Sequence, residues 1–248
     1  MPGITVNGRR FECKLVIFDL DGTLIDERKR FLNLAGARVR AMREFLGEDF
    51  VGEWARLSGV DLNKGSIDMS GPLARASRRD DLAVAATAIW LHGMKWSEAR
   101  RVAEEIYNRA DGMLADDKGE ALIAGAGDAL KRLKRAGLKL AIATNETRKA
   151  AEKVMSSLGV KEQFDFFVGA DDVQNPKPAA DMVLMACEGC GCNPSKAAMI
   201  GDQPADLTAG RRASLGVVVA VRSPTVAESE VKDLADAVID SVAELETF

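Results

Sequence analysis

Two aspartates near the amino terminus are spaced for joint chemistry. Asp19 and Asp21 directly follow the apolar run of residues 14–18, which is rich in residues that favour β-strands. In extended chain, residues i and i+2 point to the same side, so both carboxyl groups can face one site. The single histidine, His92, argues against Ser-His-Asp catalysis and against a multi-histidine metal centre. Any catalysis is therefore expected to depend on carboxylates.

Polar residues also follow later apolar runs that have the length of strands. They are Thr144 and Asn145 after residues 138–143, Lys177 within Asn-Pro-Lys-Pro shortly after 166–168, and Asp202 and Asp206 after 198–200. In an open α/β sheet, the ligand lies beyond the carboxyl ends of the strands. We therefore expect all of these segments at one edge of one sheet.

The elements that must position these residues alternate between strand and helix. Strands are expected at 14–18, 138–143, 166–168, 198–200, 217–221 and 237–239, and helices at about 126–136, 148–158, 179–188, 205–213 and 226–234. Strand–helix–strand units with short turns predict a parallel sheet that is covered on both faces. Ahead of this sheet, Asn7-Gly8 between two short strand-like runs predicts a hairpin over residues 1–12.

A long helical segment interrupts the alternation. Helices are expected at about 28–46, 50–57, 80–91 and 97–110, with a long loop over 59–77 and no strand. We predict an α/β protein with a doubly wound, Rossmann-like parallel-sheet core domain formed by residues 1–27 and 118–248. Residues 28–117 are predicted to form an inserted, all-helical cap domain.

Together, the polar motifs resemble those of the haloacid dehalogenase (HAD) superfamily. The matching residues, in the family's order, are Asp-Leu-Asp-Gly-Thr at 19–23, Thr144, Lys177, and Gly201-Asp202 with Asp206. The resemblance covers most of the chain outside residues 28–117, and it implies the α/β fold expected above.

The resemblance implies catalytic roles for four residues. Asp19 would be the nucleophile that forms an aspartyl phosphate, and Asp21 would protonate the leaving alcohol and then activate water. Lys177 would supply positive charge between the nucleophile and the phosphate oxygens. The Thr144 hydroxyl would hold phosphoryl oxygens.

A metal ion is also implied. Four gathered carboxylates repel one another and a phosphate ester, and an all-oxygen site with several waters suits Mg²⁺. By resemblance, its protein ligands are the carboxylates of Asp19 and Asp202 and the backbone carbonyl of Asp21. Asp206 would orient a metal-bound water without ligating the ion itself.

Three more residues are expected at the bound phosphate, namely Gly22, Thr23 and Asn145. Gly22 lets the backbone turn without a Cβ atom and so leaves room for the phosphate group. Nearby backbone N–H groups would join Thr144 in holding the phosphoryl oxygens.

Asp21 also indicates the reaction. Displacement of halide needs no proton, and the family's dehalogenases lack this second aspartate, so an oxygen leaving group is favoured. The resemblance therefore implies a Mg²⁺-dependent phosphatase that acts on a small phosphomonoester. A phosphosugar mutase of the β-phosphoglucomutase type has the same residues and differs in whether substrate or water captures the aspartyl phosphate. A non-catalytic regulator that binds phosphorylated metabolites is the alternative from another class.

The inserted segment directly follows the first motif, and this position resembles the helical (C1-type) cap of phosphoglycolate-phosphatase-like members. Such a cap excludes water and contributes substrate contacts. Basic residues near the expected loop are candidate contacts with the substrate anion, namely Lys64, Arg75, Arg78 and Arg79. The expected partner is a small phosphorylated metabolite.

Composition argues against other classes of partner. The chain has 34 Lys and Arg residues, 38 Asp and Glu residues and a formal net charge of −4, whereas nucleic-acid-binding proteins usually present a basic surface. No apolar run approaches the ~18–20 residues that span a bilayer. The first residues have neither the basic flank nor the apolar stretch of a signal peptide, so a cytoplasmic location is expected. The oligomeric state stays open.

Cysteine and histidine suggest no second site. Cys187, Cys190 and Cys192 lie within six residues, but no second cluster of ligands follows to complete a zinc site. Chance cysteines in a turn are favoured, and a redox or metal role stays as the alternative. His92 falls in a helical pattern and is expected to be a partly buried structural residue.

Overall fold

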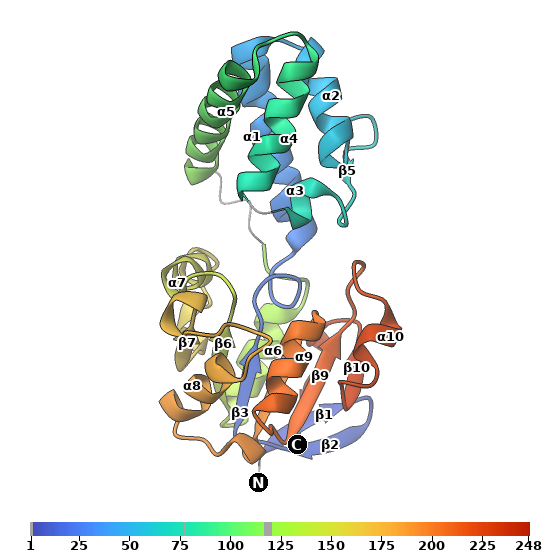
Figure 1. Ribbon diagram of the computed structural model, residues 1–248. Coiled ribbons are helices and arrows are strands. Elements are labelled where there is room, and N and C mark those ends of the chain that lie inside the picture. The colour runs from blue at the N-terminus through green and yellow to red at the C-terminus, as the bar shows by residue number, and fades with distance from the viewer. Residues whose placement is uncertain (1, 77, 117–120) are drawn as a thin grey trace. The chain divides into compact units, whose positions relative to one another are not determined.

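The computed structural model describes residues 2–76, 78–116 and 121–248, and the chain divides into two compact units (Figure 1). The core unit comprises Met1–Asp26 with Glu120–Phe248, and the helical unit comprises Glu27–Gly119. Each unit has its own buried apolar core. In the described part of the chain, no helix is both long and apolar enough to cross a membrane.

The core unit is built on a six-stranded sheet in which every pairing is parallel. Its strands, in spatial order, are β10 (Ala237–Ile239), β9 (Val217–Val221), β8 (Ala197–Gly201), β3 (Leu15–Phe18), β6 (Lys139–Ala143) and β7 (Phe166–Val168). The central strand β3 is fully buried, which is typical of a parallel strand that is covered on both faces. The predicted α/β fold with a parallel sheet is confirmed.

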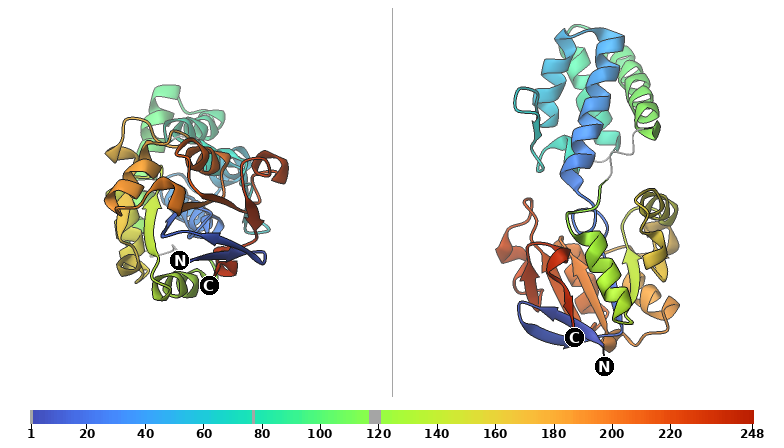
Figure 2. Two further views of the ribbon diagram at one scale, coloured as in Figure 1. Left: turned by 90° about the horizontal axis from the view of Figure 1, so that it is seen from below. Right: turned by 180° about the vertical axis from the view of Figure 1, so that it is seen from behind.

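Helices cover both faces of this sheet. They are α6 (Ala126–Arg135) and α7 (Arg148–Ser157) on one face and α8 (Asp181–Gly189) and α9 (Pro204–Arg212) on the other, with the short α10 (Glu228–Val231) before β10. In β3, Val16 and Phe18 pack with α6 and α7, whereas Leu15 and Ile17 pack with α8 and α9. Figure 1 shows α8 and α9 in front of the sheet, and the view from behind in Figure 2 shows α6 in front.

A second, small sheet of the core unit is antiparallel and has the order β11-β1-β2. Its strands are β1 (Gly3–Val6), β2 (Arg9–Glu12) and β11 (Glu246–Thr247). The hairpin turn has φ values of 50° at Asn7 and 73° at Gly8, as a type I′ turn requires. The hairpin contacts β10, because the Asn7 amide donates to the Val238 carbonyl (2.9 Å) and Arg9 donates to the Asp236 carbonyl (2.7 Å).

Single turns of 3-10 helix complete the core unit. They occupy Lys161–Gln163, Ala170–Asp172, Pro194–Lys196 and Val242–Glu244. Each of them lies within three residues of a strand of the parallel sheet, so the connections are short.

The helical unit consists mainly of four helices. They are α1 (Glu27–Leu46), α2 (Asp49–Ser58), α4 (Arg78–Leu91) and α5 (Trp96–Asp116). Their apolar faces meet in one buried core that includes Trp54, Ile89 and Ile106. The helical periodicity of the sequence therefore reflects burial of one face of each helix.

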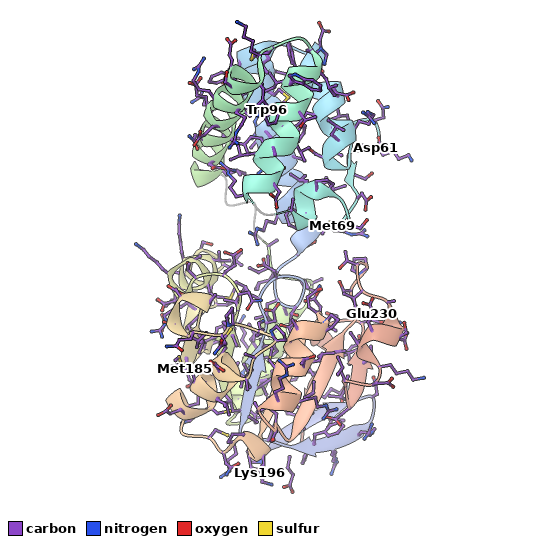
Figure 3. All side chains as sticks on the ribbon, viewed as in Figure 1. Asp61, Met69, Trp96, Met185, Lys196 and Glu230 are labelled. Atoms are coloured by element: carbon purple, nitrogen blue, oxygen red, sulfur yellow. The ribbon has the colours of Figure 1, made fainter. Side chains whose placement is uncertain are left out.

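The expectation of a long loop without strands over residues 59–77 is wrong. This segment forms the two-stranded hairpin β4 (Val60–Asp61) and β5 (Ser66–Ile67) and the short helix α3 (Pro72–Arg75). The Asp61 carboxylate, labelled in Figure 3, accepts the backbone N–H groups of Asn63 and Lys64 at 3.0 Å each. Side-chain turn chemistry thus shapes a hairpin whose strands are too short for an alternating apolar pattern.

The expectation that His92 is partly buried is also wrong. His92 is exposed, directly after the end of α4 at Leu91. Gly93, with a φ of 94°, reverses the chain there, so His92 does not share the buried face of the helix. Its ring packs against Phe50, with ring centroids 4.4 Å apart.

A buried polar network links the helices of this unit. Arg38 and Asp81 form an ion pair, and each residue is only 3% exposed. The Tyr107 hydroxyl donates to the Asp81 carboxylate (3.1 Å) and accepts from the indole N–H of Trp54 (3.2 Å). The Arg38 guanidinium also lies 3.9 Å from the centre of the Tyr107 ring. Burial raises the pKa of the Asp81 carboxyl, and Arg38 partly offsets this effect.

Asp81→Ala is expected to lower the free energy of unfolding by about 3–5 kcal/mol, because it leaves the Arg38 charge buried without its partner. Chemical denaturation followed by circular dichroism measures this loss. Glu105→Ala is the matched control, since its ion pair with Arg101 has side chains 46% and 62% exposed and exposed pairs contribute only about 0–1 kcal/mol. Equal losses in the two variants would contradict the stabilising role of the network.

Candidate active site

Polar side chains follow the three central strands of the parallel sheet. Asp19 follows β3, Thr144 follows β6 and Asp202 follows β8, and these strands are neighbours in the sheet. Their carboxyl ends therefore meet at one edge, where α/β proteins bind ligands. Lys177 comes from the segment between β7 and α8, and Asp206 from the first turn of α9. All five residues are buried, with exposed fractions of 7% or less.

Lys177 bridges two of the carboxylates. Its ammonium nitrogen lies 2.5 Å from Oδ1 of Asp19 and 2.5 Å from Oδ1 of Asp206. Burial alone lowers the pKa of this lysine, but the two carboxylates outweigh burial and raise its pKa above the ordinary value. Lys177 is therefore charged throughout the physiological pH range.

The environment of Asp19 disfavours its negative charge. Burial raises the pKa of its carboxyl well above the ordinary value of 3.8, and repulsion from Asp206 and Asp202 adds to the effect. Lys177 lowers this pKa, but one ammonium group does not balance three carboxylates. A further positive charge at this site would therefore favour the ionised form of Asp19.

Three carboxylates are arranged so that they could hold a cation. One oxygen from each of Asp19, Asp202 and Asp206 lies within 4.8 Å of the other two. Carboxylate oxygens are hard ligands that suit Mg²⁺ and related divalent ions, so the residues present fit such an ion. Asp206, expected outside the ligand set, offers an oxygen in the same cluster. The Asp21 carboxylate is not part of this cluster.

Gly22 makes room for Asp202. Its φ of 79° lies in the left-handed region, and a Cβ atom at this position would lie only 2.6 Å from Oδ2 of Asp202. Backbone conformation and space thus both require glycine. The sequence predicted that Gly22 leaves room for phosphate, whereas its nearest neighbour here is the Asp202 carboxylate.

The other expected phosphate-binding residues make contacts within the protein. The Thr23 hydroxyl is buried and donates to Oδ1 of Asp202 at 3.3 Å. Asn145 is exposed, and its amide donates to the backbone carbonyl of Lys177 at 3.4 Å. The Thr144 hydroxyl accepts the backbone N–H of Glu146 at 3.2 Å. Its own proton is then free to be donated to a ligand oxygen.

One residue of this cluster was missed by the sequence analysis. Gln203 follows Asp202 directly, and its side-chain amide donates to Oδ2 of Asp202 at 2.6 Å. The only signal in the sequence was its position before Pro204, which begins α9 and marks a helix N-terminus.

The basic residues proposed for substrate contact belong to the helical unit. Lys64 is exposed and pairs with Asp61 at 3.6 Å, and Arg78 pairs with Asp111 at 2.6 Å. The side chains of Arg75 and Arg79 lie outside the described residues. The role of these four residues in substrate binding therefore remains a prediction.

The cysteines make no disulfide and form no cluster of metal ligands within the part of the chain that the structure describes. Cys187 and Cys190 are buried at the C-terminal end of α8. Burial raises the pKa of the Cys187 thiol to about 12 and that of Cys190 to about 11. Such thiols are protonated near neutral pH and react slowly, which favours a packing role.

In this chain the first strand of the parallel sheet is followed by Asp-x-Asp, and the helical unit is inserted into the sequence shortly after this motif. This arrangement resembles that of one class of hydrolase. The family model of the haloacid dehalogenase-like hydrolases matches residues 13–214. The chain belongs to this family, and the predicted resemblance is confirmed.

Two curated relatives are similar over most of their length. The phosphoglycolate phosphatase of Chromobacterium violaceum is 29% identical over 236 residues, which cover 94% of each chain. The phosphoglycolate phosphatase of Psychrobacter arcticus is 31% identical over 212 residues, which cover 82% of this chain and 80% of the relative.

A solved structure shares the fold. The crystal structure of a HAD-superfamily hydrolase of subfamily IA from Geobacter sulfurreducens has a TM-score of 0.66 at 23% identity. The match covers 94% of this chain and 95% of the other, so it extends over both the core unit and the helical unit.

Proposed function

We propose that this protein is a Mg²⁺-dependent phosphatase that hydrolyses a small phosphomonoester through an aspartyl-phosphate intermediate. The observation that carries the proposal is the position of Asp19, which lies at the end of β3 in contact with Lys177 and beside two further buried carboxylates. Membership of a hydrolase family and similarity to phosphoglycolate phosphatases support it.

Two displacements would complete the reaction. In the first, a carboxylate oxygen of Asp19 attacks phosphorus, the P–O bond to the alcohol breaks, and Asp21 gives its proton to the departing alkoxide. In the second, Asp21 removes a proton from water while the water oxygen attacks phosphorus. The acyl–phosphate P–O bond then breaks, inorganic phosphate leaves, and Asp19 and protonated Asp21 are regenerated.

The remaining residues of the site would stabilise negative charge on the phosphoryl group or hold the metal ion. Lys177 would stabilise the charge that builds up on the phosphoryl oxygens, and the Thr144 hydroxyl would donate a hydrogen bond to one of them. Asp19, Asp202 and the backbone carbonyl of Asp21 would hold Mg²⁺, with Asp206 beside them. When bound, Mg²⁺ supplies positive charge that offsets the carboxylates and the phosphate.

For the substrate, the relatives favour phosphoglycolate or a similar small phosphorylated acid, because both are named phosphoglycolate phosphatases. A small substrate also agrees with the burial of Asp19, Thr144 and Lys177, each of which has an exposed fraction of 7% or less.

Release of inorganic phosphate from a panel of small phosphomonoesters tests the proposal. We expect turnover with Mg²⁺, loss of turnover after chelation with EDTA, and recovery when Mg²⁺ is restored. Undiminished activity in EDTA would contradict the metal requirement. Interconversion of a phosphosugar without release of phosphate would favour the mutase. A ligand that raises the melting temperature but is never turned over would favour the non-catalytic regulator.

A further inference from the structure

We propose that Gln203 is a positioning residue that orients the Asp202 carboxylate for the divalent ion, an inference that rests on the Mg²⁺ site of the proposed function. The Gln203 amide nitrogen lies 2.6 Å from Oδ2 of Asp202. A carboxylate only accepts hydrogen bonds, so the amide NH₂ group and not the amide oxygen faces it. The contact therefore has a defined direction.

Asp202 is held on both of its oxygens. Gln203 donates to Oδ2, and the Thr23 hydroxyl donates to Oδ1 at 3.3 Å. The bare Cα of Gly22 lies against the same carboxylate, and Asp202 is only 1% exposed. The carboxylate is therefore fixed in orientation before any ion arrives, which reduces the entropy lost on binding.

The Gln203 amide and the Thr23 hydroxyl are both uncharged donors. Asp19 and Asp206 each accept from the Lys177 ammonium at 2.5 Å. A neutral amide orients a carboxylate without supplying a full positive charge that would compete with a metal ion. Gln203 thus holds Asp202 in place and preserves its attraction for a cation.

Gln203 also contacts Asp206, but through its backbone. Its backbone N–H donates to Oδ2 of Asp206 at 3.0 Å, and its backbone carbonyl accepts the N–H of Asp206 at 3.0 Å at the start of α9. A substitution of the side chain leaves this backbone contact and the helix start intact. Replacement of Gln203 therefore removes one contact, the amide on Asp202, and keeps the other.

Residues that orient metal ligands typically change metal affinity 10–100-fold when they are replaced. Gln203→Met keeps the length of the side chain and removes the donor. We expect this variant to bind Mg²⁺ more weakly, with a dissociation constant raised at least about tenfold. Titration calorimetry on the full chain measures this constant. Gln163→Met, in the 3-10 turn before β7, is the matched control and should bind Mg²⁺ as the wild type does.

A second variant tests whether the effect passes through Asp202. Thr23→Val removes the other donor with little change of shape, and it should also weaken Mg²⁺ binding. Because both donors act on one carboxylate, their effects on the Mg²⁺ dissociation constant should not be independent. The fold-change in the double variant should differ from the product of the two single fold-changes by more than about twofold. Independent effects would overturn the claim that the two residues act on the same ligand.

The outcomes separate this inference from the proposed function. If the wild-type protein binds no Mg²⁺, this result contradicts both the proposed metal site and the role of Gln203. If the wild type binds Mg²⁺ and Gln203→Met binds it equally well, only the inference is overturned. A lower melting temperature of metal-free Gln203→Met with an unchanged dissociation constant would show a merely structural role and overturn it as well.

Discussion

Asp19→Asn is expected to reduce kcat for phosphomonoester hydrolysis by at least about 10⁴-fold, because the variant lacks the oxygen nucleophile that forms the acyl phosphate. The substitution is nearly isosteric and keeps the end of β3 in place. Turnover of the best substrate of the panel, with saturating Mg²⁺, measures the effect. Mass spectrometry of acid-quenched enzyme should find a phosphorylated Asp19 peptide in the wild type and none in the variant.

The same variant should not lose stability in the absence of metal. Burial and neighbouring carboxylates raise the pKa of Asp19, so its ionised form is unfavourable in the folded protein. Replacing it with a neutral amide relieves repulsion from Asp202 and Asp206. At neutral pH we expect the metal-free variant to melt no lower than the wild type. Asp128→Asn, an exposed position on α6, is the control for activity. Substantial turnover by Asp19→Asn would exclude this residue as the nucleophile.

Lys177→Met is expected to reduce kcat about 10²–10³-fold, since it removes the charge that would stabilise the phosphoryl oxygens. It should also change how stability depends on pH. The variant leaves Asp19 and Asp206 without the ammonium group that contacts both. The pKa of Asp19 then rises further, because Lys177 is the group that lowers it in the wild type.

The sign of the pH effect follows from linkage. A carboxyl group with a raised pKa binds more protons in the folded state, so its contribution to stability is present at low pH and is lost as pH rises. For metal-free Lys177→Met, the loss should begin near the unfolded value of 3.8 and extend to higher pH than in the wild type. Melting temperatures measured from pH 4 to pH 8 in EDTA test this. A parallel pH dependence of the two proteins would contradict the charge-balancing role of Lys177.

Much of the fold could be predicted because its physical causes are local in sequence. A parallel strand that is covered on both faces, such as β3 or β9, must be an apolar run. A polar residue that follows such a run must lie at the carboxyl end of the sheet. This reasoning found Asp19, Thr144 and Asp202 without knowledge of which strands are neighbours.

Other features depend on contacts that have no local signature. The strand β11 has only two residues, and it exists because β1 offers a partner at the opposite end of the chain. The contact of Gln203 with Asp202 depends on the geometry of the turn between β8 and α9. The buried pair of Arg38 and Asp81 involves charged residues, which a sequence pattern assigns to the surface.

The contacts of the amino-terminal hairpin have a consequence for self-association. Strand β10 is the outermost strand on its side of the parallel sheet, and the free backbone groups of such a strand can recruit strands from other molecules. Asn7 and Arg9 occupy two backbone carbonyls, those of Val238 and of Asp236 just before the strand. The hairpin therefore covers part of this strand edge and disfavours aggregation. A shortened chain without the hairpin would expose the edge to β-pairing with other molecules.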